Sequence, residues 1–143
     1  MASVAILVTG STDSGTTALA RTLAAVLGCP ALSADAVRAT LADQVGPMVP
    51  ADRLDAVADE ATWSTAAELE AGVVVTGSWT GEEGVARVTA GLARAGSPRT
   101  VEVWCDAGDG ATAPLGAWPV VRADATGEAD LDALVTEIGA HYS

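Results

Sequence analysis

The chain has 143 residues, the size of one domain, and half of them are hydrophobic, which excludes an intrinsically disordered chain. Seven cations, all of them arginine, stand against 19 carboxylates, and the net charge of −12 disfavours binding to nucleic-acid phosphates or anionic membrane surfaces. No apolar run approaches the roughly 20 residues that span a bilayer, and no basic stretch precedes an apolar one at the N-terminus. We therefore expect one soluble, cytoplasmic domain over residues 1–143.

Several kinds of enzyme need side chains that this chain lacks or has only once. Without lysine there is no side-chain amine for a Schiff base or for binding phosphate. The two cysteines, Cys29 and Cys105, make neither a disulfide framework nor a metal-ligand set. A zinc site, a Ser-His-Asp triad or a Cys-His pair would depend on His141 alone. We therefore expect no metal site.

Strand-like and helix-like segments alternate with short connections, which indicates an α/β fold with a parallel sheet. An apolar run predicts a strand over residues 3–9, and apolar residues at helical spacing predict a helix over 16–27, ended by Gly28. A short strand, a short helix, a loop and a long helix follow over residues 30–33, 35–42, 44–50 and 51–71. The apolar side of the long helix is expected to carry Leu54, Val57, Ala58, Ala61 and Leu69.

The second half of the chain continues the alternation. A buried strand is predicted over residues 73–76. Thr80 and Glu83 have the spacing of a capping box, which predicts a helix from there to about Ala95. Two more strands and a last helix are expected over residues 100–105, 119–123 and 130–138, with a segment of flexible composition, 106–116, between the two strands.

The turn after the first strand reads G-S-T-D-S-G-T-T over residues 10–17, the pattern of a phosphate-binding loop without its lysine. In such a loop, backbone N–H groups and the N-terminus of the next helix bind an anion. Thr16 stands in the place of the lysine, and Asp13 adds a carboxylate that repels a phosphate. One interpretation is a turn that has kept its geometry after losing its ligand. The other is an anion site formed by Gly10, Ser11, Thr12, Asp13, Ser14, Gly15, Thr16 and Thr17.

Further segments follow that loop in a recognisable order: L-S-A-D-A-V-R at 32–38, V-V-V-T-G-S-W at 73–79, V-E-V-W-C-D-A at 101–107 and D-A-T-G-E-A-D-L-D-A-L at 124–134. With V-A-I-L-V-T-G-S-T-D-S-G-T-T-A-L-A at the start, they cover nearly the whole chain. The ordered set resembles the small P-loop kinases, the group of polynucleotide 5′-kinases, gluconate- and shikimate-type kinases and chloramphenicol phosphotransferases. The resemblance implies an α/β, P-loop NTPase-like fold of three layers with a five-stranded parallel sheet in the order 2-3-1-4-5.

The resemblance also implies catalytic roles for two residues after the second strand. Asp35 matches the acidic residue that acts as general base on a substrate hydroxyl, and Arg38 matches a substrate-side arginine of polynucleotide-kinase-like members. The same two residues also fit an acid at a helix N-terminus with an ion-pair partner three positions later.

Three features depart from the pattern of these kinases. Thr16 replaces the loop lysine, and Thr76-Gly77 end the third strand where many members keep an Asp that helps to hold Mg²⁺. Residues 106–116 contain no arginine and are too few for an arginine-rich lid. Because phosphoryl transfer depends on positioning and electrostatic stabilisation, the joint loss predicts a poor ATP-dependent kinase.

Other candidate residues lie where ligands of parallel sheets bind, at the carboxyl ends of the strands. Ser78, Trp79 and Arg122 are the candidate substrate-binding residues. Trp79 would stack on a planar ligand or pack under a loop, and Arg122 could substitute for a missing cation. Cys105 is expected to be a buried thiol and not a nucleophile.

The leading hypothesis is a degenerate relative of these kinases that has lost ordinary ATP-dependent phosphoryl transfer and uses its crevice for a small ligand or a non-kinase chemistry. One alternative is an active small-molecule phosphotransferase with Asp35 as base, Arg38 on the substrate, and Thr17 with the loop backbone on Mg–ATP. The other is a non-catalytic interaction subunit. The cofactor is left open, with ATP and Mg²⁺ only if nucleotide binding survives without lysine. The expected partners are a small-molecule ligand and, because the chain is so apolar, a second copy in a homodimer.

Overall fold

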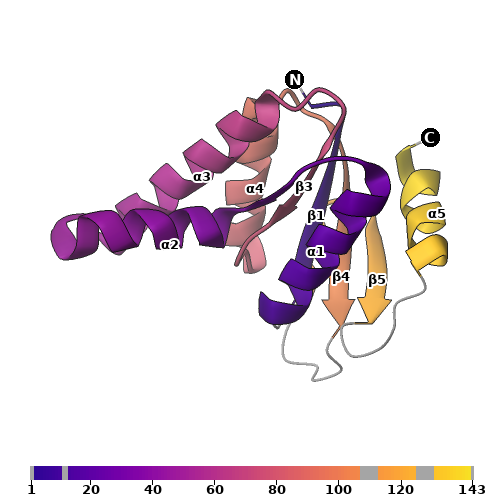
Figure 1. Ribbon diagram of the computed structural model, residues 1–143, viewed down its shortest axis with the longest axis horizontal. Helices are drawn as coiled ribbons and strands as arrows, with labels where there is room; N and C mark the ends of the chain where they lie inside the picture. The colour runs from indigo at the N-terminus through magenta and orange to yellow at the C-terminus, as the bar shows by residue number, and fades with distance from the viewer. Residues whose placement is uncertain (1, 11–12, 107–112, 125–130, 143) are drawn as a thin grey trace.

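A computed structural model describes residues 2–10, 13–106, 113–124 and 131–142, and shows a parallel sheet with helices on both faces (Figure 1). The strands are β1 (Val4–Gly10), β2 (Ala31–Ser33), β3 (Val73–Thr76), β4 (Arg99–Asp106) and β5 (Val120–Asp124). The helices are α1 (Asp13–Leu27), α2 (Ala34–Val45), α3 (Ala51–Ala67), α4 (Gly81–Arg94) and α5 (Leu131–Tyr142), with a short 3-10 helix, η1 (Gly46–Met48), between α2 and α3.

The strand order is β2-β3-β1-β4-β5, and every neighbouring pair is parallel. This confirms the α/β class and the predicted order 2-3-1-4-5. The central strand, β1, pairs with β3 on one side and β4 on the other, so that Leu7 lies opposite both Val75 and Glu102. In a sheet of this kind the carboxyl ends of the strands share one edge, which is where the candidate residues are expected.

The sheet separates two apolar clusters, which gives the molecule three layers. On one face, β-strand side chains such as Val8 and Val103 pack against Leu23 of α1 and Ile138 of α5. On the other face, Leu7 and Val75 pack against Trp63 of α3 and other side chains of α3 and α4. In Figure 1, α1 and α5 lie on one side of the sheet, and α2 runs out beside α3 as an arm.

The start of α1 and the end of α3 differ from the predicted boundaries. α1 begins at Asp13, three residues earlier than predicted. α3 ends at Ala67, short of the predicted residue 71. There the chain must turn back to the sheet: the N–H of Ser3 donates to the carbonyl of Glu70 at 3.1 Å, and Gly72 adopts a φ of +141°.

The predicted capping box is wrong. Thr80 is the N-cap residue of α4, but its side chain makes no capping hydrogen bond. The backbone carbonyl of Thr80 accepts the first bond of the helix, from the N–H of Gly84 at 2.9 Å. The helix N-terminus therefore forms through the backbone at Gly81 and the acidic first turn of Glu82 and Glu83.

Leu54 and Ala58 of α3 are buried as predicted, but the rest of the buried face differs from the prediction. Val57 and Ala61 are exposed, and Thr62, Trp63 and Ala66 are buried instead. The hydroxyl of Thr62 donates to the carbonyl of Ala58 at 2.8 Å, so this polar side chain is buried with its hydrogen bond made. Across the described part of the chain, no helix is both long and apolar enough to cross a membrane.

Candidate functional site

The carboxyl ends of β2 and β3 bring two of the predicted site residues together. The side chain of Ser33, the last residue of β2, accepts from the N–H of Ala36 at 3.1 Å and caps α2. The helix therefore presents Asp35 at the surface in its first turn. Ser78, two residues after β3, donates its hydroxyl to the carboxylate of Asp35 at 2.8 Å. Asp35 and Ser78 thus form a hydrogen-bonded pair.

Arg38 does not pair with Asp35, which lies three residues before it on α2. Its Nε donates instead to Oδ1 of Asp55 on α3. An ion pair between Asp35 and Arg38 within α2 is therefore wrong for this structure. The physical reason is packing: α2 lies along α3, which brings Asp55 within reach of the guanidinium, while Asp35 accepts from Ser78.

A cavity of about 310 Å³, which we call the Asp35 crevice, is lined by these residues and by a second ion pair. Nε and Nη2 of Arg87 on α4 donate to the two carboxylate oxygens of Asp59 at 2.8 and 3.0 Å. These hydrogen bonds raise the pKa of Arg87, against the lowering effect of its partial burial. The polar lining is Asp35, Arg38, Asp55, Asp59, Ser78 and Arg87.

Asp35 also lines a second cavity, of about 460 Å³, toward α1. There it faces the same space as Thr17 of α1, Thr76 at the end of β3 and Ser33. Arg21 is the cation among the described residues that line this second cavity. Asp35 therefore lines both cavities, with Arg21 and three hydroxyl residues around one of them and Arg38 and Arg87 around the other.

The loop between β1 and α1 is described only at its ends. Ser11 and Thr12 lie outside the described residues, and the side chains of Asp13 and Ser14 are not placed. Gly10 has no room for a side chain, because a Cβ there would lie 2.8 Å from Cβ of Cys105 and 2.9 Å from Cγ2 of Thr16. Gly15 is half-buried, and Thr16 is only 8% exposed, with its methyl group against Gly10.

The resemblance of the sequence to the small P-loop kinases implies ATP and Mg²⁺, but the described donors do not fit that group well. The residue in the place of the lysine is a buried threonine, and the strand that often ends in a metal-binding Asp ends in Thr76. No three Asp, Glu, His or Cys side chains among the described residues are close enough to hold a metal ion. The resemblance assigns Thr17 to Mg–ATP and Asp35 to the substrate hydroxyl, and both residues line the second cavity.

Trp79 is part of the core. Its side chain is 4% exposed, and its ring stacks on that of Trp63 with the centroids 6.0 Å apart and the planes at 29°. Gly77 admits the ring, since a Cβ at that position would lie 2.6 Å from Cε2 of Trp79. Of the two expected arrangements, packing under a loop or stacking on a ligand, the structure has the ring packed inside.

Two more predicted residues lie apart from both cavities. Arg122 is exposed on β5, opposite Trp104 in the register of the sheet, and lines neither the Asp35 crevice nor the second cavity. Cys105 is a buried free thiol at the end of β4, as expected. Burial raises the pKa of Cys105 to about 11, so the thiol is protonated at neutral pH.

Four charged residues were not predicted from the sequence. Asp55 and Asp59 lie four positions apart on α3, so they share one face of the helix. This spacing indicates that both carboxylates can pair with residues of a neighbouring helix. Little in the sequence indicates a structural role for Arg87 or Glu102. Glu102 is a single acidic residue in an apolar strand, and it is completely buried.

Solved structures with the same arrangement are known. A candidate kinase from Chloroflexus aurantiacus has a TM-score of 0.73 and 21% sequence identity, over 96% of this chain and 94% of its own. Shikimate kinase from Aquifex aeolicus has a TM-score of 0.57 and 16% identity, over 96% of this chain and 95% of its own. No family model and no curated protein sequence matches the chain.

The fold and the neighbours together define the class: this chain has the P-loop kinase fold. Shikimate kinase is a named example of that fold, and this chain is similar to it over nearly its whole length.

Proposed function

We propose that the chain binds a small polar ligand in the Asp35 crevice and does not carry out ordinary ATP-dependent phosphoryl transfer. The observation that carries the proposal is the state of position 16. A kinase uses a lysine there to reach the outer phosphates, whereas Thr16 is buried against Gly10 and carries no charge. By contrast, the polar residues expected on the substrate side are present and line one cavity: Asp35, Arg38 and Ser78.

The groups of the Asp35 crevice favour a ligand with hydroxyl groups, with or without a carboxylate. Asp35 and Ser78 are both exposed, so a ligand hydroxyl can replace the bond between them at little cost. Arg38 is half-buried and can hold a ligand carboxylate by a charge-assisted hydrogen bond. A small polyol or hydroxy acid satisfies both. Shikimate, the compound in the name of one structural neighbour, is such a hydroxy acid and serves as a probe.

The test is titration of shikimate and gluconate into the protein, followed by calorimetry or by NMR. We expect binding that weakens about tenfold or more in Asp35→Asn, since a hydrogen bond to a charged group contributes about 1.5–3 kcal/mol. Asp43→Asn is the matched control, because Asp43 is exposed on the same helix and does not line the crevice. Binding with equal affinity in Asp35→Asn, or no binding of either compound, would contradict the proposal.

A second candidate function is phosphoryl transfer to a small hydroxyl compound with Asp35 as the base. One observation favours it: Asp35 shares the second cavity with Thr17 and Thr76, so that a hydroxyl bound to the carboxylate would lie near the N-terminus of α1. It differs from the first proposal in requiring that ATP binds. A test that separates the two is therefore a nucleotide titration.

A further inference from the structure

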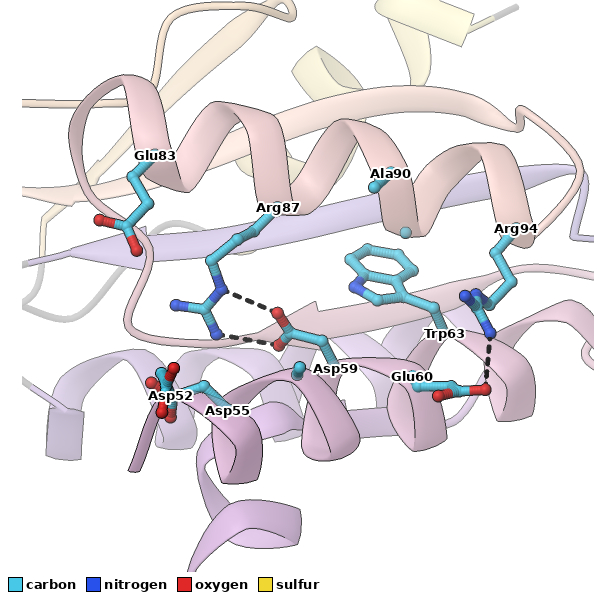
Figure 2. Close-up of a pocket in the computed structure, with 11 residues that line it drawn as sticks. Asp52, Asp55, Asp59, Glu60, Trp63, Glu83, Arg87, Ala90 and Arg94 are labelled. Carbon is cyan, nitrogen blue, oxygen red and sulfur yellow. Dashed lines mark hydrogen bonds and ion pairs between the residues drawn. The ribbon is translucent and has the colours of Figure 1, made fainter. Parts of the chain in front are cut away.

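A groove between α3 and α4 lies beyond the Asp35 crevice and has a cavity volume of about 430 Å³ (Figure 2). We call it the α3–α4 groove. It shares Asp55, Asp59 and Arg87 with the crevice, but its other lining residues extend along the two helices away from Asp35. The volume is in the range of small-molecule sites. No role assigned so far uses this groove.

The charges of the α3–α4 groove are unbalanced toward the negative. Its acidic lining is Asp52, Asp55, Asp59, Glu60 and Glu83, against two arginines, Arg87 and Arg94. Arg87 is held by Asp59, and Arg94 lies 3.1 Å from Glu60. Asp55 is paired with Arg38, which comes from outside the groove.

At one end of the groove, two carboxylates, Asp52 and Glu83, are not balanced by an ion pair within the described residues. In Figure 2 they lie at the same end of the groove, Asp52 on α3 and Glu83 on α4, with Asp55 beside Asp52. After the hydrogen bonds to Asp59, the charges of Asp55 and Glu83 also help to raise the pKa of Arg87, so both carboxylates lie near this guanidinium. This end therefore attracts a cation.

Trp63 provides an independent sign of a missing ligand. The side chain is 1% exposed, and its Nε1, like that of Trp79, has no hydrogen-bond partner. Trp63 lines the groove, whereas Trp79 does not. Buried indole N–H groups usually donate to an acceptor. In Figure 2 the indole nitrogen lies on the side of the ring toward Asp59 and Arg87. The ring cannot move into α4, because it already fills the space where a Cβ of Gly91 would lie, 2.2 Å from Nε1.

We propose that the α3–α4 groove binds a small amine that also carries hydroxyl or carbonyl oxygens, in chemical class an amino sugar or amino alcohol. The ammonium group lies between Asp52 and Glu83, and an oxygen accepts from the N–H of Trp63. A bare metal ion fits poorly, since no cluster of three ligand side chains is found in the described part of the chain. A polyamine offers no acceptor to the indole, because its nitrogens are protonated. The proposal does not depend on the function of the Asp35 crevice.

The test follows the indole N–H resonances of the ¹⁵N-labelled protein during titration with glucosamine at pH 7. Trp63→Phe assigns the resonance of Trp63 among those of the four tryptophans. We expect the Trp63 resonance to shift and saturate with glucosamine, and not with glucose or N-acetylglucosamine, which lack the charged amine. The affinity falls about threefold in Glu83→Gln, as for an exposed ion pair.

Glu82→Gln is the matched control, because Glu82 precedes Glu83 in the first turn of α4, is exposed and does not line the groove. Equal loss of affinity in Glu82→Gln and Glu83→Gln would show attraction by net charge and overturn the assigned site. A Trp63 resonance unmoved by glucosamine at tens of millimolar, or moved equally by glucose, would overturn the proposal. Calorimetry of the Glu82 and Glu83 variants repeats the test without any change at Trp63.

Discussion

Glu102 is a completely buried acidic side chain in the middle of the sheet, and its hydrogen bonds connect three parts of the molecule. Its Oε2 accepts from the hydroxyl of Thr9 at 2.6 Å and from the N–H of Leu115 at 2.8 Å. Its Oε1 accepts from the N–H of Gly116 at 3.0 Å. Thr9 directly precedes the loop glycine Gly10, so Glu102 fixes both the end of β1 and the segment that returns to β5.

Glu102→Gln replaces one acceptor oxygen by an amide that faces the same donors. We expect the free energy of unfolding to fall by about 1–3 kcal/mol, the cost of leaving a buried hydrogen-bonding group without its partner. Urea unfolding measures the change. Glu137→Gln, on the exposed face of α5, is the control and should stay within about 0.5 kcal/mol of the unchanged protein. Equal stability of both variants would mean that these three hydrogen bonds do not stabilise the fold.

Cys105 predicts a dependence of stability on pH. Its pKa is raised by burial from the ordinary 9.0 to about 11 in the folded chain. The unfolded chain loses the thiol proton first, so this contribution is complete below pH 9 and is lost as the pH rises toward 11. Over that range, unfolding becomes easier by up to about 2–3 kcal/mol. Cys105→Ala should remove this part of the pH dependence, measured by urea unfolding; an unchanged profile would contradict the assignment.

At the scale of the elements, contact between α3 and α4 depends on one glycine. Gly91 lies against the pyrrole ring of Trp63, and this contact sets how closely the two helices approach. The Arg87–Asp59 and Arg94–Glu60 ion pairs cross the same interface. The groove and the crevice both depend on this spacing, since residues of α3 and α4 line each of them.

Gly91→Ala therefore tests the helix contact. A Cβ at 2.2 Å from Nε1 of Trp63 cannot be accommodated without moving the helices, and we expect a loss of about 1–3 kcal/mol, as for other overpacked cores. Gly139→Ala on α5 is the matched control, because nothing lies within 4 Å of its added Cβ. There alanine should stabilise the helix by about 0.5–1 kcal/mol. Thermal or urea unfolding gives both values, and a stabilising Gly91→Ala would contradict the described packing.

Apolar periodicity and the loop pattern were sufficient to predict the order of the elements and the α/β class, because they reflect the backbone directly. The strand order of the sheet was predicted from the resemblance to the small P-loop kinases. The sequence also placed Asp35 and Ser78 near one edge, since the carboxyl ends of β2 and β3 must meet there. The partner of Arg38 could not be predicted in this way. Asp55 is 17 positions away, and only the packing of α2 on α3 brings it close. Trp79 was ambiguous for a related reason: a residue after a strand can turn inward or outward.

At the scale of the whole molecule, our proposal rests on Thr16, an uncharged side chain at the position where the small P-loop kinases that the sequence resembles have a lysine. The protein carries a net charge of −12 and no lysine, so the ends of the strands offer little to attract a triphosphate. The expected homodimer stays a prediction. The exposed large hydrophobic side chains, Val26, Met48 and Val57, lie on α1, η1 and α3, which are the surfaces where a second copy would first be sought.

The central claim is that the absence of the loop lysine ended nucleotide binding, and calorimetric titration with ATP–Mg²⁺ tests it most directly. The unchanged protein should show no binding at millimolar nucleotide, and Thr16→Lys should gain it, because a lysine adds a charge-assisted hydrogen bond to the phosphates. Thr16→Gln, whose side chain is long and polar but uncharged, is the control and should show no nucleotide binding. Micromolar binding by the unchanged protein, with transfer of phosphate to a hydroxyl compound that Asp35→Asn abolishes, would contradict the account and establish an active phosphotransferase.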